Sequence, residues 1–267
     1  MVDTQEAIGV FDSGVGGLTV LRQIAQRLPN ESLLYLGDTA RVPYGTKSPQ
    51  TVIRYARACA NILLQRGIKL LVVACNTASA FATNALRDEL SIPVIDVIEP
   101  GARAATQKTA NQRIGVIGTA GTVASRAYPN AIARLLPDAS VVCKPCPLFV
   151  PLAEEGWTDG EVPFAVAKTY LQELLDTHID TLVLGCTHYP LLKNVIAQSA
   201  GSSVVLVDSA EETAGAVETT LRDLKLNAPH NTAPYRHFLV SDAPEGFTRI
   251  AQRFFGGDID QVEWVDF

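Results

Sequence analysis

The chain has 267 residues, of which 22 are Lys or Arg and 28 are Asp or Glu, so its formal net charge is −6. Hydrophobic residues make up 47% of the chain and charged residues 19%, which excludes a disordered polymer. The acidic balance and the lack of a basic run argue against nucleic acid or an anionic membrane as a partner.

The first residues carry neither the basic nor the apolar segment of a signal peptide, and no apolar run approaches the roughly 20 residues of a membrane span. The five cysteines are an odd number for a disulfide framework. These features together predict a cytoplasmic protein with reduced thiols.

Short, continuous apolar runs alternate with amphipathic stretches along the chain. The runs are typical of strands buried on both faces of a parallel sheet, and they are Ile8–Phe11, Leu33–Leu36, Leu70–Ala74, Val94–Val97, Ile114–Ile117, Val141–Cys143, Leu182–Leu184 and Val204–Val207. The amphipathic stretches predict helices, namely Leu18–Arg27, Gln50–Arg66, Ala78–Leu90, Ala124–Leu135, Pro163–Leu175 and Pro190–Ala200. Near the end, His237–Val240 and Val262–Val265 are predicted strands on either side of a helix at Pro244–Phe255. Repeated strand–helix alternation predicts an α/β fold.

Two stretches of sequence recur in the same order. Residues 8–14 resemble residues 114–120, and residues 71–77 resemble residues 182–188. A cysteine follows the strand in both copies of the second pair, at Cys75 and Cys186. We therefore predict a duplicated α/β unit, whose ligand site lies beyond the carboxyl ends of the strands.

The first strand is followed by a glycine-rich turn from Asp12 to Gly17. Glycines let the backbone approach a ligand closely, and the start of the next helix offers N–H groups to a phosphate or carboxylate. Asp38, at the end of the second strand, suits a ribose-binding acid, but the glycine spacing does not match a dinucleotide fingerprint. A tight turn without a ligand is the competing interpretation, as it is for the loop from Ala40 to Gly45.

Cys75 and Cys186 each stand where a strand ends and a helix is predicted to begin. A helix N-terminus favours a thiolate, and His188 is close enough in sequence to exchange a proton with Cys186. Each cysteine alone is compatible with a small buried side chain. Because they occupy equivalent strand ends, we interpret them as functional.

Other cysteine chemistry is less well supported. Cys143 and Cys146 have the spacing of a dithiol redox pair, but Pro147 and Pro151 predict a loop after the second thiol rather than an activating helix. No further ligands of suitable spacing suggest a zinc site, and no metal is predicted. Cys59 is a predicted core residue.

Two thiols on opposite faces of a substrate carbon are the arrangement needed to invert that carbon by proton transfer. One thiolate removes a proton from one face and the other thiol returns a proton to the opposite face. Such a site must also stabilise a carbanion with preorganised donors. No lysine occupies a strand-end motif, so a pyridoxal cofactor is not expected.

Four motifs, at residues 12–18, 40–45, 74–79 and 185–190, closely resemble those of the aspartate/glutamate racemase family, and in particular its glutamate racemases. The resemblance spans nearly the whole chain from Ile8. It implies two flavodoxin-like α/β domains related by pseudo-symmetry, residues 1–97 with 210–267 and residues 98–209, with the active site in the cleft between them. It also implies cofactor-independent interconversion of L- and D-glutamate for peptidoglycan synthesis, and a homodimer.

The resemblance further implies roles for individual residues. Cys75 takes the proton from D-glutamate and Cys186 takes it from L-glutamate, assisted by Asp12, His188 and Glu154. The positions implied to bind substrate are Asp12, Ser13, Tyr44, Gly45, Asn76, Thr77, Thr187 and His188.

Three other functions remain as alternatives. A two-domain binding protein for an acidic amino acid would also close on its ligand, but would need no paired cysteines. An NAD-dependent oxidoreductase would use the Gly14–Gly17 turn. Within the family, racemisation of aspartate or of a hydantoin is the nearest alternative.

Overall fold

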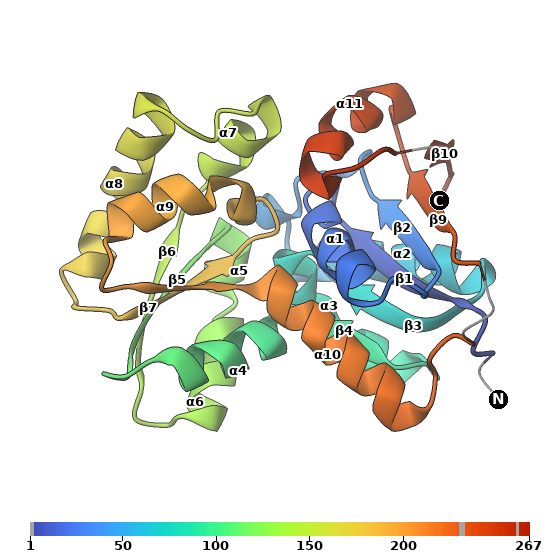
Figure 1. The fold of residues 1–267 in the computed structure, drawn as a ribbon, viewed down its shortest axis with the longest axis horizontal. Coiled ribbons are helices and arrows are strands. Elements are labelled where there is room, and N and C mark those ends of the chain that lie inside the picture. The colour runs from blue at the N-terminus through green and yellow to red at the C-terminus, as the bar shows by residue number, and fades with distance from the viewer. Residues whose placement is uncertain (1–2, 230–232, 260–261) are drawn as a thin grey trace. The chain divides into compact units, whose positions relative to one another are not determined.

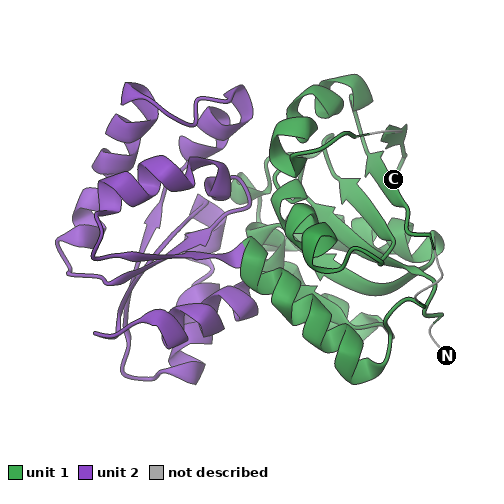
Figure 2. Cartoon of the chain, viewed as in Figure 1, with its two compact units in different colours: residues 1–97, 210–267 green, residues 98–209 purple. Residues whose placement is uncertain are grey.

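The computed structural model describes residues 3–229, 233–259 and 262–267. The chain divides into two compact units, Met1–Val97 with Ala210–Phe267 and Ile98–Ser209 (Figure 2). Each unit is built on its own sheet, and every strand pairing within the two sheets is parallel (Figure 1).

The first unit contains a six-stranded sheet in the order β10-β9-β2-β1-β3-β4. Its strands are β1 (Ala7–Asp12), β2 (Leu33–Gly37), β3 (Ile68–Val73), β4 (Val94–Asp96), β9 (Arg236–Val240) and β10 (Val262–Trp264). Its helices are α1 (Leu18–Arg27), the 3-10 turn η1 (Tyr44–Thr46), α2 (Pro49–Gln65), α3 (Asn76–Glu89), α10 (Ser209–Leu224) and α11 (Pro244–Phe255). Every residue of β1, β2 and β3 is buried, as expected for strands with a helix layer on each face.

The second unit contains a four-stranded sheet in the order β6-β5-β7-β8. Its strands are β5 (Arg113–Gly118), β6 (Ser140–Pro145), β7 (Thr181–Gly185) and β8 (Val205–Asp208). Its helices are α4 (Ile98–Lys108), α5 (Ala120–Ala124), α6 (Ala127–Leu135), α7 (Phe149–Glu155), α8 (Glu161–Leu175), the 3-10 turn η2 (Tyr189–Leu192) and α9 (Lys193–Ala200). Helix α4 packs on α6 and α8 packs on α9, and the two pairs cover opposite faces of the sheet (Figure 1).

The two sheets share one topology. The order β2-β1-β3-β4 in the first unit is repeated as β6-β5-β7-β8 in the second. The strands that carry the sequence repeat, β1 with β5 and β3 with β7, therefore occupy equivalent positions. This is the strand order of a flavodoxin-like doubly wound sheet, and the predicted α/β class with parallel sheets is confirmed.

Two predicted helices begin later than predicted. The helix predicted at Ala124–Leu135 is α6, which begins only at Ala127 because Arg126 adopts a left-handed conformation, with φ of 57°. The helix predicted at Pro190–Ala200 begins as the 3-10 turn η2 and becomes α-helical only from Lys193.

The sequence patterns also miss four helices, α4, α5, α7 and α10. The expectation of a loop after Cys146 is wrong, since α7 begins at Phe149. Pro151 is the third residue of this helix, where its missing N–H removes no intrahelical hydrogen bond. Among the described residues, no helix is long and apolar enough to cross a membrane.

Candidate active site

The first group of predicted residues lies at the carboxyl ends of β1 and β3, which are neighbours in the sheet. The N–H of Ala74 donates to the carbonyl of Phe11 at 2.9 Å, so Asp12, the last residue of β1, and Cys75, just beyond β3, lie at the ends of two paired strands. The Asp12 side chain is fully buried, and its Oδ2 accepts from the N–H of Gly14 at 3.0 Å. Burial, together with nearby Asp12 and Cys75, raises the pKa of Tyr35. Two acidic groups thus share one buried corner of the first unit.

Gly17 is required here by packing. A Cβ at Gly17 would lie 2.5 Å from Cβ of Asp12 and 3.0 Å from Cβ of Ala74. Its φ of −61° is available to any residue, so the close approach alone explains the glycine. The glycine-rich turn thus lets helix α1 start in contact with Asp12. This close packing explains Gly17 without a bound dinucleotide.

Cys75 caps the amino end of α3. Its Sγ accepts from the N–H of Ala78 at 3.5 Å and lies 3.5 Å from Oγ of Ser13, and the residue is 6% exposed. Asn76 and Thr77 are the first residues of the helix, and both are buried. A helix start of this kind presents N–H groups to a carboxylate and favours an anionic sulfur.

The loop at Ala40–Gly45 follows β2 and ends in η1. Tyr44 is 1% exposed, and its hydroxyl donates to the Asp38 carboxylate. Gly45 beside it is half-buried. Asp38 also accepts hydrogen bonds from Arg41 and Ser241, so its carboxylate is occupied and is not a ribose-binding acid.

The second group of predicted residues follows β7. Nδ1 of His188 lies 3.9 Å from Sγ of Cys186 and 3.4 Å from Oγ1 of Thr187, while Nε2 lies 2.9 Å from Oε1 of Glu154. Glu154 comes from the last turn of α7, 34 positions earlier in the chain. The imidazole therefore joins a carboxylate on one side to a thiol on the other.

His188 is almost fully buried, and burial by itself lowers its pKa. The hydrogen bonds and charges of Cys186 and Glu154 outweigh that effect and raise the pKa of His188 to about 10. The raised pKa favours the imidazolium form of this side chain. This form places a positive charge and a proton donor beside Cys186.

At the remaining cysteines, burial is the largest influence on the pKa. Burial raises the pKa of Cys143 to about 11 and that of Cys146 to about 12. Burial also raises the pKa of Cys59, which packs in the core of the first unit. These three thiols stay protonated at neutral pH, which disfavours dithiol redox chemistry at Cys143 and Cys146. In the part of the chain that the structure describes, no group of three or more His, Cys, Asp or Glu side chains could hold a metal ion.

Two polar features of the structure lie near the predicted site but were not among the predicted site residues. Thr119 follows β5 as Ser13 follows β1, and its Oγ1 lies 3.0 Å from that of Thr122 at the start of α5. The internal repeat aligns Thr119 with Ser13 and was sufficient to find it. The second feature is the set of partners around Asp38, for which the sequence holds no comparable pattern.

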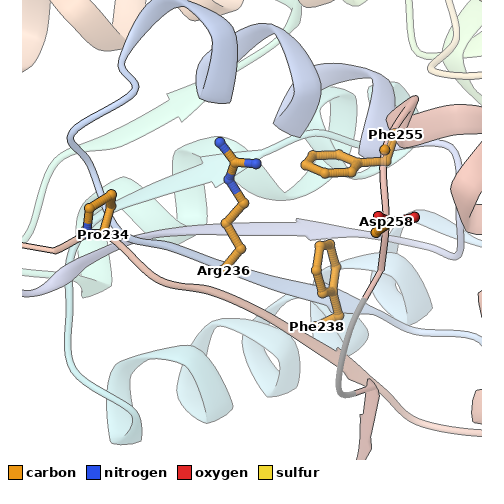
Figure 3. A pocket seen from close by; sticks show the side chains of 6 residues that line it. Pro234, Arg236, Phe238, Phe255 and Asp258 are labelled. Atoms are coloured by element: carbon orange, nitrogen blue, oxygen red, sulfur yellow. The ribbon is translucent and has the colours of Figure 1, made fainter.

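A separate cavity of about 520 Å³ lies in the first unit (Figure 3). Its walls include Arg236, Phe238, Phe255 and Asp258. None of these residues belongs to the predicted site. Arg236 is the first residue of β9, so the cavity lies toward the amino end of that strand, whereas the predicted site lies at the carboxyl ends.

Comparisons with known proteins agree with this geometry. A family model described as Asp/Glu/Hydantoin racemase matches residues 8–217. A glutamate racemase of Geobacter metallireducens is 59% identical over 260 residues, covering 97% of this chain and 96% of the relative. Among solved structures, a glutamate racemase isoform of Bacillus anthracis matches with a TM-score of 0.94 and 43% identity, covering 98% of this chain and 97% of that one. The Francisella tularensis glutamate racemase, solved with D-glutamate, matches with a TM-score of 0.92 and 38% identity over 98% of both chains. The chain therefore belongs to the Asp/Glu/hydantoin racemase family.

Proposed function

We propose that this protein interconverts L- and D-glutamate by proton transfer at the α-carbon, with Cys75 and Cys186 as the two bases. The observation that carries the proposal is the equivalence of the two thiols. Each follows the corresponding strand, β3 or β7, of a duplicated sheet, and each has a hydrogen-bonding partner beside its sulfur. The identity of 59% to a glutamate racemase supports glutamate as the substrate.

In the proposed reaction, the Cys75 thiolate removes the α-proton of D-glutamate and the Cys186 thiol delivers a proton to the opposite face. The reverse direction exchanges the two roles, so that Cys186 takes the proton from L-glutamate. Each turnover leaves one sulfur protonated and the other deprotonated, which balances the protons. General acid–base groups of this kind contribute about 10²- to 10⁴-fold to a rate.

The side chains next to each thiol can stabilise the negative charge of its thiolate. The buried carboxylate of Asp12 assists Cys75 in the proposal. On the other side, the imidazolium of His188 stabilises a Cys186 thiolate or supplies a proton to it, and Glu154 keeps the ring charged and oriented. The reaction uses side chains alone and needs no cofactor.

The remaining predicted residues are proposed to hold the two carboxylates and the amino group of glutamate. They are Ser13, Tyr44, Gly45, Asn76, Thr77 and Thr187, together with Asp12 and His188. The N–H groups at the start of α3 suit an anionic ligand. Since the Tyr44 side chain is buried against Asp38, we assign binding at Tyr44 and Gly45 to their backbone N–H groups.

We propose that the two compact units act as the two catalytic domains, each contributing one thiol, and that D-glutamate is supplied for peptidoglycan synthesis. A reducing compartment such as the cytoplasm would keep both sulfurs reduced. We also propose a homodimer, which light scattering on the purified protein tests by its mass. Exposed apolar side chains are available for an interface, among them Leu148, Trp157 and Val162, at 52%, 57% and 50% exposure.

One experiment tests the reaction directly. Purified protein is incubated with each glutamate enantiomer in D₂O without added cofactor, while optical rotation and deuterium at Cα are followed. We expect the rotation to decay to zero from either side and the newly formed enantiomer to carry deuterium. Binding without loss of rotation would instead support a binding protein, and faster turnover of aspartate than of glutamate would reassign the substrate.

A further inference from the structure

The Asp38 carboxylate collects three side chains that the proposed mechanism does not use. Nε of Arg41 lies 2.9 Å and 2.7 Å from its two oxygens, Oγ of Ser241 donates to Oδ1 at 2.9 Å, and the Tyr44 hydroxyl donates to Oδ2. Asp38 is fully buried, so its charge depends on these partners. Asp38 precedes the loop at residues 40–45, called here the substrate loop because Tyr44 and Gly45 are proposed to bind glutamate. We interpret Asp38 as a residue that holds this loop in place.

The partners of Asp38 fix both ends of the loop at residues 40–45. Tyr44 is held at one end through its hydroxyl. At the other end, the N–H of Ala40 donates to Oγ of Ser241 at 2.9 Å, the same oxygen that binds Asp38. Next to it, Oγ1 of Thr39 donates to the carbonyl of Asp242 at 2.6 Å. The loop is thus tied to the segment that follows β9.

Arg41 lies between two aromatic rings. Its Cζ is 3.6 Å from the centroid of the Phe267 ring and 4.4 Å from that of Tyr55. The Arg41 side chain is only 20% exposed, although it lies in a surface loop. Excluding water from the Arg41–Asp38 pair strengthens its electrostatic attraction.

Phe267 is itself 45% exposed, and the residues before it hold it in place. The N–H of Val265 donates to the carbonyl of Val240 at 2.9 Å, and the Val265 side chain is buried. Nε1 of Trp264 donates to the carbonyl of Ser241 at 3.1 Å. Trp264, the last residue of β10, therefore contacts Ser241, which binds Ala40, and Phe267 contacts Arg41 in the loop at residues 40–45.

We propose that Arg41 is a positioning residue for substrate binding and that Phe267, stacked on its guanidinium, makes glutamate affinity depend on the segment after β10. This inference rests on the proposed function, because it takes the backbone of Tyr44 and Gly45 to contact glutamate. Loss of the ring lets water reach Arg41 and loosens its pairing with Asp38. The loop then shifts, and binding of the ground state and of the transition state weakens by the same factor. KM therefore rises while kcat stays nearly unchanged.

The matched control is another guanidinium beside an aromatic ring in the same unit. Cζ of Arg236 lies 5.7 Å from the centroid of the Phe255 ring, in the cavity shown in Figure 3. Arg236 begins β9 whereas Ser241 follows its last residue, so the two sites lie at opposite ends of that strand. Arg236→Ala removes a longer contact of the same kind that the proposal does not involve.

The experiment compares KM and kcat in both directions for wild type, Phe267→Ala, Phe267→Tyr, Arg41→Lys and Arg236→Ala, with thermal unfolding of each. We expect Phe267→Ala to raise KM about three- to tenfold, in keeping with a partly shielded cation–π contact. We expect kcat to change less than about twofold and Phe267→Tyr to restore KM. Arg41→Lys should raise KM, because an ammonium lacks the flat face on which the two aromatic rings pack. Arg236→Ala should behave as wild type.

An unchanged KM in Phe267→Ala overturns the inference, as does an equal rise in Arg236→Ala. A fall in kcat with lowered thermal stability that Phe267→Tyr does not rescue also overturns it, since that result indicates a structural role alone. Failure of the proposed function would appear earlier and separately, as absence of racemisation by the wild-type protein.

Discussion

Nε2 of His188 lies 2.9 Å from Oε1 of Glu154, and the opposite ring nitrogen lies 3.9 Å from Sγ of Cys186. The pair joins two segments 34 positions apart, the last turn of α7 and the residues after β7. It turns a buried imidazole into a charged one.

The His188 pKa rises from the ordinary value of 6.5 to about 10, with burial opposing the rise and Cys186 and Glu154 causing it. The imidazolium therefore stabilises the folded chain fully below about pH 6.5, and this contribution is lost as the pH rises toward 10. We expect the free energy of unfolding, measured by urea titration, to fall over that interval. Glu154→Gln should show a smaller fall, and an identical pH profile in the variant would contradict the assignment.

The two proposed bases are tested by Cys75→Ser and Cys186→Ser. Serine keeps the size of the side chain but does not ionise near neutral pH, so each variant should lose about 10²- to 10⁴-fold in kcat. Glutamate binding, measured by calorimetry, should remain detectable. Cys143→Ser is the matched control, because burial keeps that thiol protonated, with a pKa of about 11, and its activity should be unchanged. Near-wild-type turnover in either of the first two variants would refute the two-thiol mechanism.

Replacing Gly17 by alanine is expected to impair catalysis through a steric clash with Asp12. Alanine there would place its Cβ 2.5 Å from Cβ of Asp12, so the acid must move. We expect a loss of about 1–3 kcal/mol in stability from overpacking. Displacement of Asp12 should lower kcat/KM by about 10- to 100-fold.

The control for Gly17→Ala is Gly215→Ala in α10, where the nearest atom to a new Cβ would be Cζ of Arg27 at 3.9 Å. Removing a helical glycine should stabilise the chain by about 0.5–1 kcal/mol and leave activity unchanged. Denaturant titrations and steady-state rates on both variants check the pair. Equal activity of Gly17→Ala and wild type would show that the position of Asp12 does not matter.

Breaking the buried ion pair between Lys69 and Glu31 in the first unit is expected to lower stability without involving the proposed site. Nζ of Lys69 lies 2.6 Å from Oε2 of Glu31, with side-chain exposures of 0% and 4%, and it also donates to the carbonyl of Thr4 at 2.7 Å. Lys69→Met leaves a buried carboxylate without its cation and should cost about 3–5 kcal/mol in unfolding experiments. The double variant with Glu31→Leu should recover much of that loss, because no buried charge remains. A double variant as unstable as the single one would contradict this account.

Several features of this protein were determined by the sequence alone. Continuous apolar runs fixed β1, β3, β5 and β7 as buried strands, and the repeat fixed their equivalence, which the common strand order confirms. Helices α1 and α11 begin and end where their periodicity predicts. Local patterns succeed here because burial on both faces of a parallel sheet leaves few alternatives for a Leu- and Val-rich run.

Only the tertiary structure decided the surroundings of the functional side chains. Sequence spacing placed His188 near Cys186, but the hydrogen bond to Glu154 depends on α7, a helix concealed by Pro151 within it and Pro147 just before it. Likewise, nothing local indicates that Asp38 accepts from Ser241, 203 positions away, or that Phe267 covers Arg41. These contacts depend on which strands pair and on which segments the sheet brings to one edge, a long-range property that local periodicity does not contain.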